Sequence, residues 1–178
     1  MKDNTAFFTI VSSNYLPQAI VLFGSVKKNH PQSDFYIFIS DTKNADLIPL
    51  QDDNLYYIWG ADIGIKNFYN MAFFYNCVEF NTSLKPFAFN FILKLESYTN
   101  IFYLDPDIYL FNNLSSIENR LEDFNIVLTP HVISPTQPSD DKLFLRYGIY
   151  NLGFLAINNS NESRSFIEWW MDALSIYC

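Results

Sequence analysis

The amino-acid sequence predicts an α/β protein with three layers, in which helices cover both faces of a mostly parallel sheet. Short apolar runs typical of buried strands alternate with segments whose apolar residues recur every three or four positions, as on one face of a helix. The chain has 178 residues, of which 49% are hydrophobic. This length and composition suit one domain over residues 1–178 with a substantial core, and we find no repeat, low-complexity segment or linker.

The N-terminal segment predicts a strand, a helix and a second strand. Residues 6–11 are apolar except for one threonine and predict a buried strand. Ser12, Ser13 and Asn14 follow with side chains that cap helices. One helical face is then formed by Leu16, Ala19, Ile20, Phe23 and Val26. Residues 35–40 predict the second strand, and the short connections favour a parallel pair joined by a right-handed crossover.

The rest of the chain continues this alternation. We expect further strands at residues 55–59, 100–104, 126–129 and 150–157, helices at 65–75, 84–95, 115–121 and 162–177, and an irregular loop at 132–143. Thr82 or Ser83 is expected to cap the second of these helices. The last helix is expected to bury Trp169 and Trp170 and to begin at a capping box between Asn159 and Glu162.

The strand at residues 100–104 runs into the triplet Asp105-Pro106-Asp107. Charged groups at the end of a buried strand are costly unless they are paired. In extended backbone, residues i and i+2 point to the same side, so the two carboxylates can converge. Converging carboxylates are typical ligands of Mg²⁺ or Mn²⁺. The alternative is an ordinary turn, in which aspartate side chains accept hydrogen bonds from nearby backbone N–H groups.

Composition excludes several classes of function. The net charge of −8 argues against nucleic acid as a partner, because phosphate backbones attract basic surfaces. No apolar run approaches the ~18 residues of a transmembrane helix, and no signal peptide is evident. The two cysteines are far apart in sequence and imply no disulfide framework. Together these features predict a cytoplasmic protein, either free or in peripheral contact with the inner face of the membrane. The nucleotide and hydrolase motifs GxGxxG, GxxxxGK[ST] and GxSxG are missing.

Polar residues follow several of the predicted strands. They are Ser12, Asn14, Asp41, Asp105, Asp107 and His131. In an open parallel sheet, ligands bind beyond the carboxyl ends of the strands, so we expect a site there. His131 is either a ligand or base in that site or a histidine that only completes the strand end.

A series of motifs resembles a known family. In order, they are Asn-Tyr at 14–15, Leu-Lys-Pro at 84–86, Tyr-Leu-Asp-Pro-Asp-Ile at 103–108, Leu-Thr-Pro-His at 128–131, Asn-Leu-Gly-Phe at 151–154 and Trp-Trp at 169–170. Together they resemble a bacterial glycosyltransferase of the GT-A fold, in the glycogenin-like and lipopolysaccharide-glycosyltransferase group. The similarity covers nearly all of the chain, and the ordered set is more specific than any one motif.

The resemblance implies a metal-dependent glycosyltransferase. The donor would be a nucleotide-diphosphate sugar, a UDP-sugar first of all. The acceptor would be a glycan or a lipid-linked glycan in bacterial surface polysaccharide or glycan synthesis. By the same resemblance, Asp105 and Asp107 hold Mn²⁺ or Mg²⁺ on the diphosphate, and Asp105 also reaches toward the ribose. Nothing in the sequence decides between retention and inversion at the transferred sugar.

The resemblance also assigns the donor-binding residues on the nucleotide side. It implies that Thr9, Asn14 and Tyr15 receive the base and the ribose. The alternatives are that Thr9 is an ordinary strand residue and that Tyr15 covers the start of the following helix.

On the other side of the diphosphate, the resemblance implies that Lys85 approaches the diphosphate or the sugar. It further implies that Asn151 and Gly153 border the donor-sugar pocket. The alternatives are a solvated lysine beside the apolar helix stripe and a β-bulge at residues 151–153, since glycine inside a strand often marks one.

The family pattern continues past the Trp-Trp helix into an Asp-Gln segment and a histidine motif, which this sequence does not contain. We therefore expect a GT-A-like domain that lacks its C-terminal part. One alternative is a non-catalytic module that binds a nucleotide or a partner protein. Another is a Mg²⁺-dependent phosphoryl-transfer enzyme with Asp105 as nucleophile.

Overall fold

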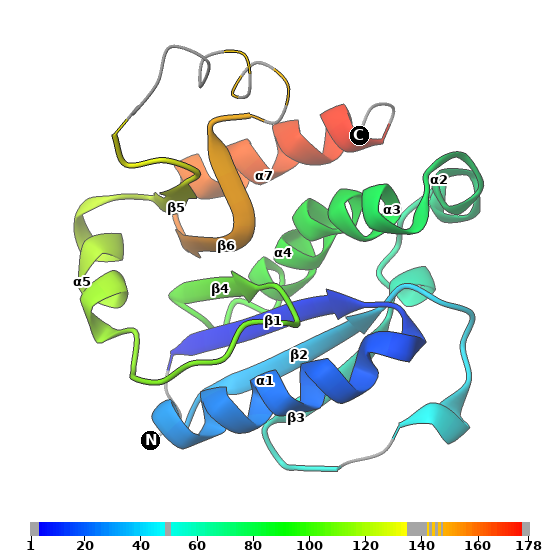
Figure 1. The fold of residues 1–178 in the computed structure, drawn as a ribbon, viewed down its shortest axis with the longest axis horizontal. Helices are drawn as coiled ribbons and strands as arrows, with labels where there is room; N and C mark the ends of the chain where they lie inside the picture. The colour runs from blue at the N-terminus through cyan, green and yellow to red at the C-terminus, as the bar shows by residue number, and fades with distance from the viewer. Residues whose placement is uncertain are drawn as a thin grey trace.

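A six-stranded sheet forms the centre of the molecule (Figure 1). The structure is a computed structural model that describes residues 4–48, 51–134, 142, 144, 146 and 148–175. The strands are β1 (Thr5–Val11), β2 (Asp34–Ile39), β3 (Leu55–Trp59), β4 (Asn100–Leu104), β5 (Ile126–Pro130) and β6 (Tyr150–Asn158). They lie in the order β3-β2-β1-β4-β6-β5. Most of the predicted loop at 132–143 lies outside the described residues.

The direction of the strands confirms a mostly parallel sheet with one exception. β3, β2, β1 and β4 run parallel to one another. β6 is antiparallel to both β4 and β5. Consequently β6 begins at the edge of the sheet where β1, β2 and β4 end, and its first residues lie beside the aspartates that follow β4.

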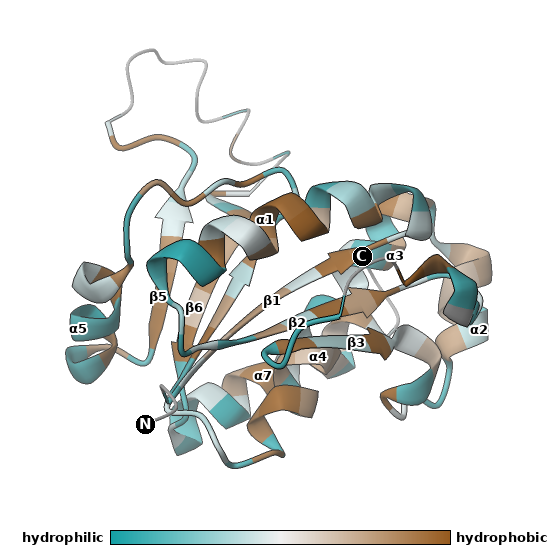
Figure 2. Ribbon diagram, turned by 90° about the horizontal axis from the view of Figure 1, so that it is seen from below, coloured by the Kyte–Doolittle hydropathy of each residue, from teal (hydrophilic) through white to brown (hydrophobic). Residues whose placement is uncertain are grey.

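Helices cover both faces of the sheet, as the sequence predicts. They are α1 (Leu16–Asn29), α2 (Phe68–Phe74), α3 (Cys77–Ser83), α4 (Lys85–Leu93), α5 (Ser115–Asp123) and α7 (Asn161–Leu174), with short 3₁₀ turns at η1 (Ser13–Tyr15), η2 (Ala45–Leu47) and η3 (Gly60–Asp62). Figure 2 shows α1 on one side of the strands and α4 with α7 on the other. No helix in the described part of the chain is both long and apolar enough to cross a bilayer.

The two faces of β1 supply two separate hydrophobic clusters. Phe7 packs with α1 and stacks on Phe102 at 5.0 Å between ring centroids. Phe8 faces the opposite side, where its ring and that of Phe89 of α4 lie nearly perpendicular with centroids 4.7 Å apart. Successive side chains of a strand point to opposite faces, so an unbroken apolar run is the pattern required of a strand covered on both sides.

The predicted helix at 84–95 is preceded by a helix that the sequence analysis missed. α3 is capped by Asn76, whose side-chain oxygen accepts hydrogen bonds from the N–H groups of Val78 and Glu79. Glu79 in turn accepts one from the Asn76 N–H group, which completes a capping box. The cap expected at Thr82 or Ser83 is therefore wrong, and α4 follows α3 directly.

Three other local expectations are also wrong. η1 occupies the segment expected to cap α1, and Tyr15 at the helix start makes no capping bond with its side chain. The cap of α7 is Ser160 instead of Asn159. Trp170 packs into the core with 8% exposure, whereas Trp169 is 62% exposed. Adjacent residues on a helix point about 100° apart, so both cannot face the sheet.

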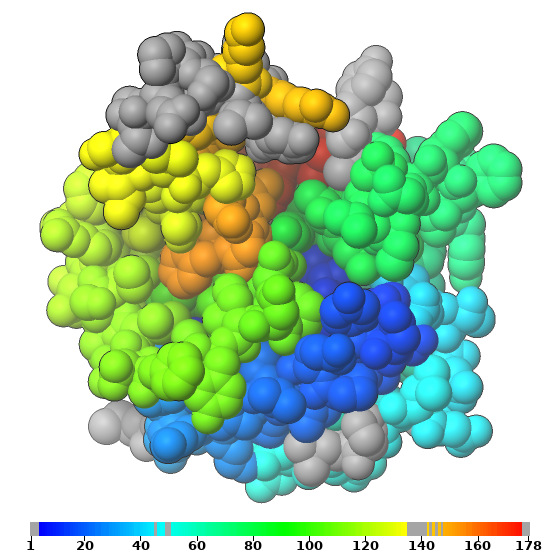
Figure 3. Space-filling view, viewed as in Figure 1, coloured from blue at the N-terminus to red at the C-terminus, as the bar shows by residue number. Residues whose placement is uncertain are grey.

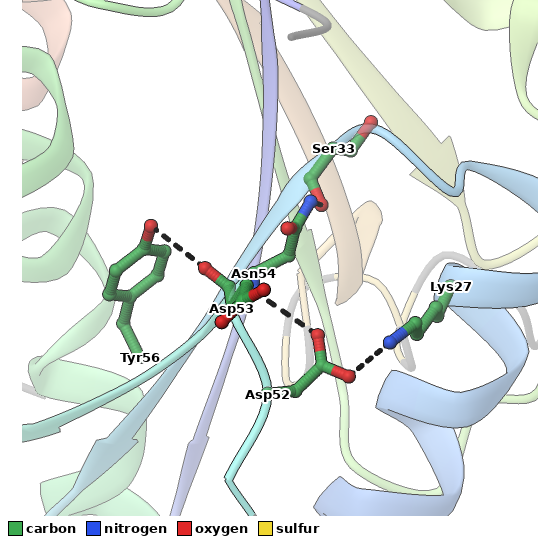
Figure 4. Close-up of polar contacts among 6 residues, drawn as sticks. All are labelled: Lys27, Ser33, Asp52, Asp53, Asn54 and Tyr56. Carbon is green, nitrogen blue, oxygen red and sulfur yellow. Dashed lines mark hydrogen bonds and ion pairs between the residues drawn. The ribbon is translucent and has the colours of Figure 1, made fainter.

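Polar contacts fix the segment that leads into β3 (Figure 4). The Lys27 ammonium of α1 pairs with Asp52, and Asn54 donates to the Ser33 carbonyl at 3.2 Å. The hydrogen bond from Lys27, followed by that from the Asn54 N–H group, lowers the pKa of Asp52. These contacts lie far from the carboxyl edge and serve the fold.

A buried tyrosine network makes stability depend on pH in the alkaline range. Tyr98 donates to Asp34 at 2.6 Å and accepts from Tyr36 at 2.7 Å. Burial, followed by the bond to Asp34, raises the pKa of Tyr98 well above its usual value. Because the folded state holds this proton more tightly than the unfolded chain, the stabilisation is complete below pH ~10 and is lost as the pH rises above it.

At pH 8, we expect the free energy of unfolding of the Tyr98→Phe variant to be about 1–3 kcal/mol lower than that of the parent protein. The difference should shrink above pH ~10, by at most about 1.4 kcal/mol per pH unit. Urea titrations at several pH values measure it. A difference that stays constant between pH 8 and pH 11 contradicts the network's role.

Candidate functional site

A pocket of about 370 Å³ opens at the carboxyl edge of the sheet. Its walls are the end of β1 with Ser12 and Tyr15, the exposed side of α3, Lys85 at the start of α4, and the end of β4 with the turn that follows. Figure 3 shows this hollow between the green segment of α3 and the yellow-green segment after β4, with dark blue β1 at its floor.

Asp105 and Asp107 both line this pocket, as the sequence predicts. Asp-Pro-Asp does form a turn, as in the alternative considered for this triplet, and the Ile108 N–H group donates to the Asp105 carbonyl at 3.0 Å. The turn uses backbone oxygen, and among the described residues neither carboxylate accepts a local backbone N–H group. Both carboxylates therefore remain available to a ligand in the pocket.

The Asp105 carboxylate is oriented by Tyr103, two residues earlier on the same face of β4. The Tyr103 hydroxyl donates to Oδ1 of Asp105. Burial, followed by the charge of Asp105, raises the pKa of Tyr103, which keeps the hydroxyl protonated as a donor. Tyr103 was not among the candidate residues, although the i, i+2 alternation of a strand would have pointed to it.

Lys85 lies inside the pocket wall, and the alternative of a solvated lysine is wrong. Its side chain is only 7% exposed, and Nζ lies 3.6 Å from Oδ1 of Asp105. Nζ also donates to the Leu152 carbonyl at 2.9 Å and sits 4.4 Å from the centre of the Tyr103 ring. One ammonium thus connects α4, β4 and β6 at the bottom of the candidate site.

The segment 151–153 forms an irregular stretch of β6 that contacts Asp105, so the β-bulge named as the alternative for these residues is present. The pairing with β5 jumps from Leu128–Leu155 to Thr129–Asn151. Within it, the Gly153 N–H group donates to Oδ1 of Asn151 at 2.7 Å, and the Gly153 carbonyl accepts from the Asp105 N–H group at 2.8 Å. The bulge brings Gly153 against the Asp105 carboxylate, whereas neither Asn151 nor Gly153 lines the pocket.

The three residues expected on the nucleotide side are placed differently from one another. Tyr15 lines the pocket and is half exposed. Asn14 is exposed in the same turn, where its side-chain oxygen accepts from the Ser12 hydroxyl at 2.6 Å. Thr9 is fully buried inside β1 and does not line the pocket, which matches its reading as a strand residue.

Two other strand-end residues have structural contacts. His131 lies beyond β5, where its backbone N–H group donates to the Ile149 carbonyl and Nδ1 lies 3.0 Å from the Gly148 carbonyl oxygen. Asp41 accepts a hydrogen bond from the Ser13 N–H group and so holds η1 against the end of β2. His131 does not line the pocket, which favours the strand-end reading.

The wall formed by α3 was missed by sequence reasoning. Cys77, Val78, Asn81 and Thr82 from this helix line the pocket. The Asn81 side-chain oxygen is buried without a hydrogen-bond partner within the described residues. The capping box at Asn76 was the available signal, since it places the helix start before these residues.

The pocket supplies part of the set of oxygen ligands that a divalent cation requires. Asp105 and Asp107 supply carboxylates, and no cluster of three or more His, Cys, Asp or Glu side chains suited to a metal occurs among the described residues. Mg²⁺ and Mn²⁺ commonly bind through one or two carboxylates plus phosphate oxygens and water. The donor set therefore suits a cation shared with a phosphate ligand.

A larger cavity of about 710 Å³ lies at the opposite edge of the sheet. Several of its polar groups are paired with one another: Thr5 donates to Glu118 at 3.0 Å and Asn159 to the Tyr98 carbonyl at 3.0 Å. Size alone does not make it the functional site, because these groups already stabilise the fold.

Comparisons with known proteins fit this geometry. No family model matches the chain. Among curated proteins, the chain is 23% identical over 176 residues to the uncharacterized protein YfnF of Bacillus subtilis (strain 168). The aligned region covers 94% of this chain and 57% of that relative.

Among solved structures, the chain is similar to the galactosyltransferase LgtC in complex with donor and acceptor sugar analogues (TM-score 0.61, 18% identity, 97% of this chain and 66% of that one). It is also similar to the glycosyltransferase GlyE of Streptococcus pneumoniae TIGR4 (0.60, 17%, 99% and 39%). A third is core-mannan synthase A of Aspergillus fumigatus in its Mn/GDP form (0.57, 9%, 99% and 66%).

These similarities define the fold. The chain has the fold of bacterial GT-A glycosyltransferases, in agreement with the sequence analysis. It spans less than two thirds of the length of the relatives named above.

Proposed function

We propose that the pocket at the carboxyl edge binds a nucleotide-diphosphate sugar together with Mn²⁺ or Mg²⁺ for glycosyl transfer to a glycan or lipid-linked acceptor. The observation that carries this proposal is the placement of Asp105 and Asp107 in one pocket with the buried ammonium of Lys85. UDP is the nucleotide to test first, in the context of bacterial surface polysaccharide or glycan synthesis.

The charges of the pocket require a cation for this ligand. Two carboxylates would repel a diphosphate, and one ammonium already faces Asp105 at 3.6 Å. A divalent ion held by Asp105 and Asp107 would offset the charge that develops on the leaving nucleoside diphosphate. Tyr103 and the bulge at Gly153 keep the Asp105 carboxylate aimed at the pocket.

The solved relatives support the same ligand class. LgtC is described with donor and acceptor sugar analogues, and core-mannan synthase A with Mn and GDP. Their identity to this chain is low, so the argument for this protein rests on the residues of its own pocket.

We expect UDP to bind the full chain in the presence of Mn²⁺ and to bind much more weakly in EDTA. Asp107→Asn should weaken the Mn²⁺-dependent binding by about 100-fold, since losing one partner of a close charge contact costs about 3 kcal/mol. Isothermal titration measures both effects.

Asp123→Asn is the matched control, because Asp123 is exposed at the end of α5, and it should bind like the parent protein. UDP binding that does not depend on the metal, or that is unchanged in Asp107→Asn, would contradict the proposal. Metal-dependent binding without transfer or hydrolysis of any UDP-sugar would favour a non-catalytic nucleotide-binding module.

A further inference from the structure

Lys85 occupies a position that is unfavourable for a cation in two respects. Its side chain is 7% exposed, and burying an ammonium is costly unless it is paired. It is also the first residue of α4, where the helix dipole and unpaired N–H groups favour negative charge. Buried Leu84 and Ser83 on one side and Pro86 on the other hold it there.

Contacts in the pocket help to offset this cost, among them the Asp105 carboxylate at 3.6 Å, the Leu152 carbonyl at 2.9 Å and the face of the Tyr103 ring at 4.4 Å. Of these, the Asp105 carboxylate carries a full negative charge. The Asp105 side chain is 40% exposed, so the carboxylate faces Lys85 on one side and the pocket on the other.

From this geometry we infer that Lys85 is the internal counter-ion of Asp105 and competes with a divalent cation for that carboxylate. When metal and nucleotide bind together, the Lys85 ammonium gives up its pairing with Asp105 and pairs with a phosphate oxygen. Metal and nucleoside diphosphate therefore bind cooperatively, and the metal alone binds weakly. This inference rests on the proposed function, because it concerns the same site and the same ligands.

The electrostatic reason is the like charge of the two cations. A divalent ion on Asp105 would lie beside an ammonium in a partly buried site, where repulsion is weakly screened. Asp107 is exposed and makes no ion pair within the described part of the chain, so it offers the metal an uncontested first contact. A diphosphate relieves the repulsion by adding negative charge, and by linkage each ligand raises the affinity for the other.

The test is the affinity of the full chain for Mn²⁺ alone. It is measured by titrating the protein with Mn²⁺ and detecting free Mn²⁺ by electron paramagnetic resonance. Lys85→Met and Lys85→Gln should each bind Mn²⁺ about 10-fold more tightly than the parent protein. Gln keeps an N–H donor for the Leu152 carbonyl, so one variant preserves that bond if the other loses stability. Lys85→Arg, which keeps the charge, should bind Mn²⁺ as weakly as the parent.

Lys94→Met is the control for general charge, because Lys94 is exposed at the end of the same helix, and it should not change Mn²⁺ affinity. The same titrations with UDP present should show a smaller UDP-induced gain in Mn²⁺ affinity for Lys85→Met and Lys85→Gln than for the parent. Thermal melts confirm which variants are folded.

The inference is overturned if both neutral variants bind Mn²⁺ no more tightly than the parent, or if Lys85→Arg gains affinity like them. Either result could occur while the parent still binds UDP and Mn²⁺ together, which leaves the proposed function intact. If the parent binds neither Mn²⁺ nor UDP under any of these conditions, both the proposed function and the inference are wrong.

Discussion

Gly153→Ala should lower the affinity for UDP in the presence of Mn²⁺ by about 30-fold, the scale seen when a group that orients a metal ligand is disturbed. A Cβ at this position would lie 2.9 Å from Oδ1 of Asn151 and 3.0 Å from Oδ2 of Asp105. Both atoms are the ends of side chains, so they can move apart without unfolding the protein. The Asp105 carboxylate is then displaced from the direction set by Tyr103 and Lys85.

Gly24→Ala is the matched control, because no atom lies within 4 Å of the Cβ that it would add in α1. It should bind UDP and Mn²⁺ normally and gain about 0.5–1 kcal/mol of stability, since alanine suits a helix interior better than glycine. Isothermal titration and urea unfolding of the two variants give the comparison. Normal binding by Gly153→Ala contradicts the role assigned to the bulge.

Phe89→Ala should cost about 3–5 kcal/mol of the free energy of unfolding. The Phe89 ring is fully buried between α4 and the sheet, and its centroid lies 4.7 Å from that of the Phe8 ring. Its removal leaves a cavity under the helix whose first residue is Lys85. Urea unfolding at neutral pH measures the loss, and an unfolded variant agrees with the expectation when the parent protein is only marginally stable.

Phe73→Ala makes the same chemical change on the surface, because Phe73 of α2 is 84% exposed. It should alter stability by no more than about 0.5 kcal/mol. Equal losses for the two variants contradict the assignment of Phe89 to the core.

Local patterns predicted the elements of this fold well. β1, α1, β2, β3 and β4 appear close to their expected positions, because the alternation of strands and the 3.6-residue period of helices are written in consecutive side chains. The errors were the helix caps, one missed helix and one core residue. α3 was missed because its capping box at Asn76 lies inside a stretch without a clear apolar stripe, and Trp169 was assigned to the core because it was counted with Trp170 in the apolar stripe of the last helix.

The residues of the candidate site were likewise predicted only in part. Spacing alone placed Asp105 and Asp107 on one side of a strand end, and the structure brings both into a pocket. The sequence analysis did not identify Tyr103 as the hydrogen-bond donor to Asp105, and it left Thr9 as a ligand candidate although that side chain is fully buried.

The sequence by itself therefore determined the fold class and the acidic pair at the end of β4, because both depend on interactions between residues near one another in the chain. Only the tertiary structure decided that β6 runs antiparallel, that Gly153 lies against Asp105, and that the Lys85 ammonium is buried beside that carboxylate. These three features join segments 20 or more residues apart, and they arise from strand pairing and helix packing that no local preference encodes.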